Sequence, residues 1–261
     1  HVIICGWNKH GRRIIRTIDN LAHGEKEIVL INDLSEEKVT ALRSRFRQIK
    51  LYFVSGDFTR ENILERASIR DSQTVVVIPN ETDTILSSPD EKTIFATMTI
   101  KSIDPNIRVV AYLMDKENLT HMKRTNVDEV VVSDDFGAYM VASHVIETGV
   151  PQTVSHLLDE TASSRFICQK IPKDFIGRPF SALSDHFRNE GGLILVGVFS
   201  IEENLGINSI LSADSSSLDA FIEHKLKEGG ISLQEAEKVS TVINPHEEYL
   251  ISDSEQAVVI S

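Results

Sequence analysis

A sixfold alternation of short apolar runs and amphipathic stretches fills the first half of the chain. The apolar runs are rich in β-branched residues and show little polar alternation, as is typical of parallel strands buried on both faces; they are Val2–Cys5, Ile28–Asn32, Leu51–Val54, Thr74–Ile78, Arg108–Ala111 and Glu129–Val132. Helical patterns separate them, over Gly11–Leu21, Ser35–Arg47, Thr59–Ala67, Thr93–Ser102 and Lys116–Thr125. This order predicts an α/β fold, a Rossmann-like doubly wound parallel sheet with its ligand crevice at the carboxyl ends of the strands.

A helical hairpin is predicted next, because two helical stretches, Phe136–Thr148 and Gln152–Asp159, are separated by Gly149–Val150–Pro151. Glycine ends a helix readily, and proline suits the first turn of the next one. The first stretch is apolar over much of its surface and needs a cover. We therefore expect a crossover helix–turn–helix that pairs with a second copy of the chain.

From Ser163 onward, strand-like runs and turns replace the alternating pattern, which predicts a small α+β lobe with few helices. The runs are Phe166–Ile171, Leu193–Phe199, Val242–Ile243 and Ala257–Ile260. An insert rich in Ser and Gly covers about residues 202–240, with short helices expected over Ser217–Lys227 and Ser232–Ser240. The expected parts are thus 1–135 (Rossmann-like lobe), 136–160 (crossover) and 161–261 (C-terminal lobe).

Composition and missing motifs exclude several functions. With 27 basic and 39 acidic residues the net charge is −12, so we expect no nucleic-acid partner. The two cysteines, Cys5 and Cys168, lie in apolar runs and are expected to be buried, reduced thiols. Walker A, G-x-S-x-G and HExxH sequences are absent, which favours a protein that is not an enzyme. Because His1 begins a strand directly, we expect a fragment of a longer protein.

A glycine-rich turn connects the first strand to the first helix. The spacing Gly6-x-Asn8-x-x-Gly11 matches the dinucleotide fingerprint G-x-G-x-x-G except at its middle position. Asn8 is expected to bring a side chain to the place where a phosphate would approach. The helix N-terminus still favours an anion, and basic side chains are available from Lys9, Arg12 and Arg13.

The ribose end of the expected crevice departs from the fingerprint as well. Asn32 stands where an acid usually holds the ribose hydroxyls, and Asp33 follows it. Asp57 and Thr59 belong to the loop after the third strand, near the expected position of an adenine ring. We predict weak binding of an adenine nucleotide or NAD; the alternative is a turn that closes the sheet over an empty crevice.

Five segments in order along the chain resemble one known family. They are HVIICGW, GDFT, IDPNIRVVAYLMDKEN, VDEVVVSDDFGAYMVASHVIETG and VINPHEEYLISDSEQAVVI, and they resemble the RCK domain, the regulator of K⁺ conductance in potassium channels and uptake systems. The resemblance implies a homodimer through Phe136–Asp159 and an octameric gating ring. It also implies a transmembrane pore upstream in the full-length chain and a place at the cytoplasmic face of the membrane.

The resemblance is incomplete at the ligand sites. NAD-binding members carry an intact glycine loop and an acid at position 32, and calcium-binding members carry carboxylates where this chain has Pro79, Tyr112 and Met114. A longer acidic loop follows the fourth strand instead. Hard oxygen ligands suit Ca²⁺ or Mg²⁺, so the candidate metal ligands are Glu81, Asp83, Asp90 and Glu91. The alternative is a solvated loop that holds no metal.

The function implied by the resemblance is ligand sensing that regulates potassium flux through a pore outside this segment. A ligand in the crevice would change how two lobes pack about the crossover. Two alternatives remain: a regulatory nucleotide-binding subunit of a potassium transporter, and an NAD(P)-dependent oxidoreductase. Two transmembrane helices upstream would indicate a channel, and turnover of NADH would indicate an oxidoreductase.

Overall fold

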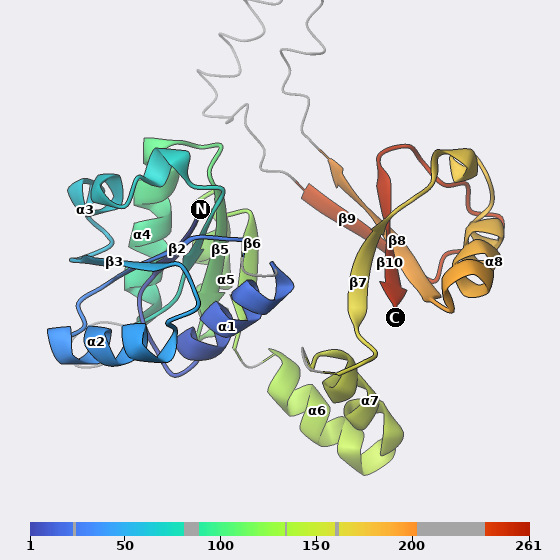
Figure 1. Ribbon diagram of the computed structural model, residues 1–261, viewed down its shortest axis with the longest axis horizontal. Helices are drawn as coiled ribbons and strands as arrows, with labels where there is room; N and C mark the ends of the chain where they lie inside the picture. The colour runs from blue at the N-terminus through green and yellow to red at the C-terminus, as the bar shows by residue number, and fades with distance from the viewer. Residues whose placement is uncertain (23–24, 81–88, 134, 160–161, 203–237) are drawn as a thin grey trace, which may run out of the picture. The chain divides into compact units, whose positions relative to one another are not determined.

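The computed structural model describes residues 1–22, 25–80, 89–133, 135–159, 162–202 and 238–261. The chain divides into two compact units, His1–Ala142 and Ser143–Ser261, whose elements are labelled in Figure 1. The boundary lies within helix α6 (Asp135–Ile146). The predicted division into 1–135, 136–160 and 161–261 stays a prediction.

The first unit contains a six-stranded parallel sheet with the strand order β3-β2-β1-β4-β5-β6. Its strands are β1 (Val2–Cys5), β2 (Ile28–Asn32), β3 (Leu51–Ser55), β4 (Thr74–Val77), β5 (Arg108–Leu113) and β6 (Glu129–Val132). Strand β1 pairs with β2 on one side and with β4 on the other, so Val2 lies opposite both Ile28 and Thr74. The strand order therefore reverses beside β1, and the doubly wound sheet expected from the sequence is confirmed.

Helices cover both faces of this sheet, as the amphipathic patterns predict. They are α1 (Gly11–Leu21), α2 (Glu36–Arg45), α3 (Glu61–Arg66), α4 (Pro89–Ile103) and α5 (Leu119–Lys123). Ile15 of α1 and Leu42 of α2 pack with Ile4 on one face. Leu64 of α3 and Ile100 of α4 pack with Ile3 on the other face. Neighbouring residues of β1 thus enter different cores, as side-chain alternation along a strand requires.

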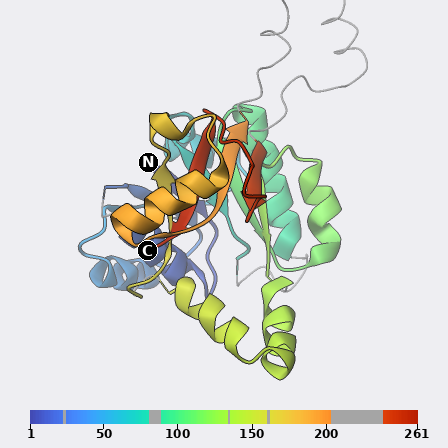
Figure 2. The same cartoon turned by 90° about the vertical axis from the view of Figure 1, so that its right-hand side faces the viewer.

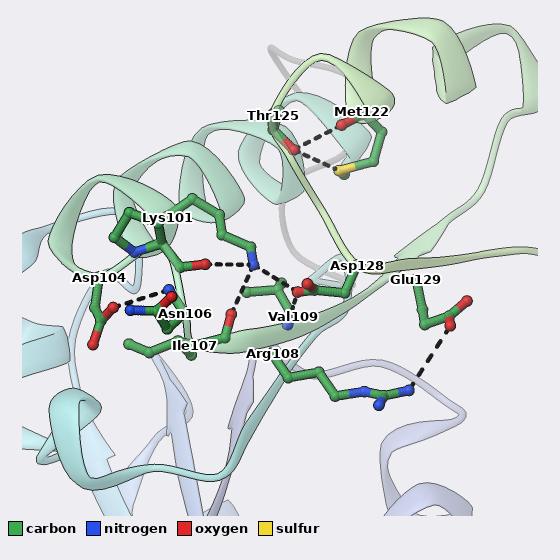
Figure 3. Close-up of polar contacts among 11 residues, drawn as sticks. Lys101, Asp104, Asn106, Ile107, Arg108, Val109, Met122, Thr125, Asp128 and Glu129 are labelled. Carbon is green, nitrogen blue, oxygen red and sulfur yellow. Dashed lines mark hydrogen bonds and ion pairs between the residues drawn. The ribbon is translucent and has the colours of Figure 1, made fainter. Parts of the chain in front are cut away.

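A buried ion pair fastens α4 to the amino ends of β5 and β6 (Figure 3). The Lys101 ammonium lies 2.7 Å from Oδ2 of Asp128, and it also donates to the carbonyl oxygens of Pro105 and Ile107. The same Asp128 oxygen accepts a hydrogen bond from the Val109 N–H. The buried charges are therefore paired and hydrogen-bonded, which a low-dielectric site demands.

The second unit combines helices with a four-stranded antiparallel sheet in the order β7-β10-β8-β9. The strands are β7 (Phe166–Lys170), β8 (Ile194–Glu202), β9 (Lys238–Ile243) and β10 (Glu255–Ile260), and helix α7 (Gly149–Leu157) precedes them. Helix α8 (Phe180–Gly191) lies across one face of the sheet (Figure 2). This confirms the α+β lobe.

In the C-terminal lobe one helix was not predicted and two expectations were wrong. Cys168 was expected to be buried, but it lies on the exposed side of β7, where exposed and half-buried residues alternate. The sequence analysis named no helix between Phe166–Ile171 and Leu193–Phe199, yet α8 forms there and buries Phe180, Leu183 and Phe187 against the sheet. Residues 238–240, expected at the end of a short helix, belong to strand β9 because they pair with Ser200–Glu202 of β8. The expected helix over Ser217–Lys227 lies outside the described residues.

A search of the described helices for a membrane span found none with the required length and hydropathy.

Candidate functional site: a crevice at the carboxyl ends of the strands

The turn after β1 is built around two glycines at the point where the strand order reverses. Gly6 has φ +91°, and a Cβ there would lie 1.9 Å from the carbonyl oxygen of Ile78. A Cβ at Gly11 would lie 2.8 Å from the ring of Trp7. Both positions therefore require glycine, one for backbone conformation and close approach and the other for contact with an aromatic ring.

Asn8 occupies the middle position of the fingerprint and is buried. Its Nδ2 donates to the carbonyl oxygen of Pro79 at 3.1 Å, and its Oδ1 accepts from the His10 N–H at 2.9 Å. Both polar groups of this side chain thus bond within the protein, whereas the sequence suggested a side chain that narrows the approach of a phosphate. Asn8 therefore links the turn to the end of β4, and it accepts a hydrogen bond from the His10 N–H beside the start of α1.

Positive charge surrounds the start of α1. Lys9, Arg12 and Arg13 are all exposed, and α1 is eleven residues long. A helix of that length carries a partial positive charge at its N-terminus, which favours an anion. The structure thus places the predicted basic residues around the start of α1, and phosphate binding there stays a prediction.

Asn32 ends β2 with an unsatisfied polar group. The side chain is 1% exposed, and its Oδ1 accepts a hydrogen bond from the Leu34 N–H at 3.0 Å. Its Nδ2 is buried without a hydrogen-bond partner. A buried donor left unpaired costs about 1–3 kcal/mol, so an acceptor on a ligand would relieve a real penalty at this position.

Lys92 of α4 joins the two acidic positions expected at the ribose end. Its Nζ lies 3.8 Å from Oδ2 of Asp33 and 3.6 Å from Oδ1 of Asp57. It also lies 5.0 Å from the centre of the Phe58 ring, within range of a cation–π contact. The sequence analysis missed Lys92, because no local pattern shows that the first turn of α4 lies beside the ends of β2 and β3.

Thr59 orients the Asp57 carboxylate. Its N–H and hydroxyl both donate to Oδ1 of Asp57, at 3.1 and 2.9 Å. Partial burial raises the pKa of Asp57, but the two Thr59 hydrogen bonds and the charges of Lys92 and Arg60 outweigh it, so the pKa lies below its usual value. Asp57 is thus a fixed anion at this edge of the sheet.

The predicted metal ligands are only partly described. Glu81 and Asp83 lie outside the described residues, while Asp90 and Glu91 belong to the first turn of α4 rather than to a loop. Asp90 is fully buried and accepts hydrogen bonds from the Met114 N–H, the Asp115 N–H and Asn118 Nδ2 at 2.8, 2.9 and 2.9 Å. No cluster of three or more His, Cys, Asp or Glu side chains that could hold a metal occurs in the described part of the chain. The metal site stays a prediction.

Comparison with known proteins places this crevice in a family. Residues 2–133 match the TrkA-N domain, which is half of the chain. The chain belongs to the TrkA-N domain family. The match covers helices α1 to α5 and all six strands of the parallel sheet, and it ends before α6 begins. It confirms the resemblance to RCK domains.

Relatives of this TrkA-N domain include potassium channel proteins. The calcium-gated potassium channel TvoK of Thermoplasma volcanium is 25% identical over 163 residues, covering 62% of this chain and 44% of TvoK. Probable potassium channel protein 2 of Methanocaldococcus jannaschii is 24% identical over 156 residues, covering 58% of this chain and 40% of the relative. The chain thus spans less than half the length of these two channel proteins.

The fold of the whole chain also has a solved counterpart. The human SLO3 gating ring matches all of this chain and 44% of the SLO3 chain, with a TM-score of 0.64 and 12% sequence identity. At that identity the likeness concerns the fold alone. It agrees with an arrangement of a TrkA-N unit followed by a small antiparallel lobe.

Proposed function

We propose that this chain is a ligand-sensing domain that regulates potassium flux through a pore outside the segment, and that it is not an enzyme. One observation carries the proposal: a glycine turn at the switch point of a TrkA-N sheet, in a chain whose relatives include potassium channel proteins. A regulatory domain needs a ligand and two states, and no chemical step is required.

The ligand we propose is an adenine nucleotide. Its phosphate would lie at the start of α1, near Gly11, Lys9 and Arg12, where helix dipole and side-chain charge add. Its ribose and base would lie beside Asp33 and Asp57, which accept hydrogen bonds from hydroxyl groups. Binding is weak by this account, because position 32 offers an amide in place of a carboxylate and loses one charge-assisted hydrogen bond.

The homodimer we propose forms through Phe136–Asp159, the predicted crossover. Apolar side chains are exposed along helices α6 and α7 and directly after α7; those most exposed are Tyr139, Val141, Val145, Ile146 and Leu158. A patch of this kind is characteristic of an interface. Dimers would assemble further into an octameric gating ring at the cytoplasmic face of the membrane, with the pore upstream in the full-length chain.

The proposal is tested by potassium flux. The full-length protein would be reconstituted in vesicles, and flux would be measured with and without AMP, ADP, ATP or NAD⁺. We expect nucleotide to change the flux about 5- to 150-fold, the range of a typical coupling free energy. Arg12→Glu should abolish the response, while Arg16→Glu, an exposed charge one turn further along α1, should preserve it. A potassium flux that is the same with and without each nucleotide would refute nucleotide sensing.

A divalent cation is the second candidate ligand, because the relative TvoK is a calcium-gated potassium channel. Glu81, Asp83, Asp90 and Glu91 would supply the oxygen ligands, although Asp90 would have to give up hydrogen bonds that it now accepts. A Ca²⁺ or Mg²⁺ titration of flux, with these carboxylates replaced by Asn and Gln, tests this candidate. The sequence upstream of this segment distinguishes a channel from a transporter subunit, because two transmembrane helices there would indicate a channel.

A further inference from the structure

The two halves of the crevice are built differently. In a doubly wound sheet a dinucleotide spans the switch point, with one nucleoside over the β1-β2-β3 side and the other over the β4-β5 side. Each side can therefore be examined for the room and the hydrogen-bonding groups that a nucleoside requires.

On the β4 side, the glycine turn is tied down to the sheet by hydrogen bonds. The Trp7 N–H donates to Oδ1 of the buried Asn80 at 2.8 Å, and Asn8 Nδ2 donates to the carbonyl oxygen of Pro79 at 3.1 Å. The polar groups at the end of β4 are thus already used by the turn. A second nucleoside would find them occupied.

On the β5 side, an aromatic contact joins β5 to the start of α1. The rings of His10, at the start of α1, and Tyr112, near the end of β5, are tilted with centroids 5.8 Å apart. Tyr112 also packs with the core on the α1 face of the sheet. The end of β5 cannot easily shift aside, because the Asp90 carboxylate accepts the N–H groups of Met114 and Asp115.

The β2-β3 side differs, because one of its polar groups has no hydrogen-bond partner and another is exposed to solvent. Asn32 Nδ2 is buried and unpaired at the end of β2. Asp33 is 52% exposed, and its contact with Lys92 is a long one at 3.8 Å. A ribose supplies hydroxyl groups that both accept from an amide and donate to a carboxylate, so this side suits one nucleoside.

We propose that the crevice takes a ligand with a single nucleoside, a nucleoside 5′-mono- or diphosphate, and excludes dinucleotides. The ribose binds between the ends of β2 and β3, the phosphate binds at the start of α1, and the His10–Tyr112 pair closes the other half. This inference rests on the proposed nucleotide sensing and specifies its ligand class.

Isothermal titration calorimetry of the 261-residue chain with AMP, ADP-ribose and NAD⁺ tests this inference. We expect AMP to bind at least tenfold more tightly than NAD⁺, with ADP-ribose close to NAD⁺ because both carry a second ribose. Tyr112→Ala should open the β5 side. The affinity for NAD⁺ should then lie within about threefold of the affinity for AMP, and the affinity for AMP should stay unchanged. Tyr52→Ala, which removes an exposed ring of β3 away from the crevice, is the matched control and should keep the preference.

The outcomes separate this inference from the proposed function. Equal affinity for AMP and NAD⁺ would overturn the single-nucleoside assignment and leave nucleotide sensing intact. Binding of none of the three would overturn both. Should Tyr112→Ala fail to fold by circular dichroism, His10→Ala opens the same ring pair from the turn. A tenfold preference that survives removal of either ring would overturn the role given to the His10–Tyr112 pair as the barrier to a second nucleoside.

Discussion

Lys101 and Asp128 form the most deeply buried ion pair described above, and Figure 3 shows it near a partly exposed pair between β5 and β6, Arg108–Glu129. Asp128→Asn leaves the Lys101 ammonium buried without a counter-charge, so we expect a loss of about 3–5 kcal/mol in unfolding free energy. Glu129→Gln, whose partner is 3.8 Å away and partly exposed, should change it by at most about 1 kcal/mol. Urea denaturation measures the unfolding free energy of both variants. Equal losses would mean that burial does not determine how much the Lys101–Asp128 pair contributes.

The Asp57 carboxylate contributes a pH dependence whose sign follows from its pKa. Because the folded pKa lies below the usual value, folding favours the ionised form, and the stabilisation is complete above the unfolded pKa, about 3.9. It is lost as the pH falls through the folded pKa. We therefore expect the stability difference between the wild type and Asp57→Asn to be largest at neutral pH and to shrink below about pH 4. A difference in unfolding free energy that grows on acidification would contradict this.

At the scale of elements, the first turn of α4 is held in place by Asp90, whose two oxygens accept two backbone N–H groups after β5 and one side-chain amide. Asp90→Asn weakens these charge-assisted bonds, each worth about 1.5–3 kcal/mol, and should lower the unfolding free energy by at least that amount. Glu91→Gln, exposed on the same turn, should change it by less than about 0.5 kcal/mol.

The same pair of variants examines the metal hypothesis. If the carboxylates near α4 bind Ca²⁺, the cation raises the melting temperature of the wild type, and Glu91→Gln reduces that rise. A rise that Glu91→Gln leaves unchanged would remove Glu91 from the ligand set. Differential scanning calorimetry with and without Ca²⁺ distinguishes a structural Asp90 from a ligating cluster.

The elements that could be predicted are those whose signal is local. Apolar runs separated by amphipathic stretches predicted β1 to β6 and the helices between them to within a few residues. This was possible because the pattern of neighbouring residues indicates both strand burial and helix periodicity. Helix α8 carried the same kind of signal and was overlooked: Phe180, Leu183 and Phe187 are spaced three and four apart, and Gly192, with φ +63°, follows its end. The pairing of 238–240 with β8 needs a partner about forty residues away and has no local signal.

In the candidate site too, residues that lie close together in the sequence could be predicted, and residues that only the fold brings together could not. Gly6, Gly11 and the basic residues of α1 were found because the fingerprint is contiguous. Lys92 and Tyr112 were not assigned to it, since only the folded sheet brings α4 and β5 to the edge where β1 and β2 end. The Asn32 amide was noted as a missing acid, whereas its unpaired nitrogen depends on which neighbours surround it in the fold.

For the whole molecule, the α6–α7 hairpin is the surface through which we expect the chain to dimerise. Val141 is 71% exposed and Val145 is 79% exposed, and each apolar side chain buried in a dimer would contribute about 1.5–3 kcal/mol. We expect sedimentation velocity to show a dimer at micromolar concentration. The double variant Val141→Glu, Val145→Glu should sediment as a monomer, because association would bury charges without partners.

The control for this experiment is Leu21→Glu, which places the same charge on a similarly exposed apolar residue at the end of α1. That variant should remain a dimer, since the hairpin is intact. A double variant that still sediments as a dimer would place the interface on another surface. The exposed apolar residues Phe95 and Met98 of α4 would then be the next to replace, because they lie three residues apart on one helix of the first unit.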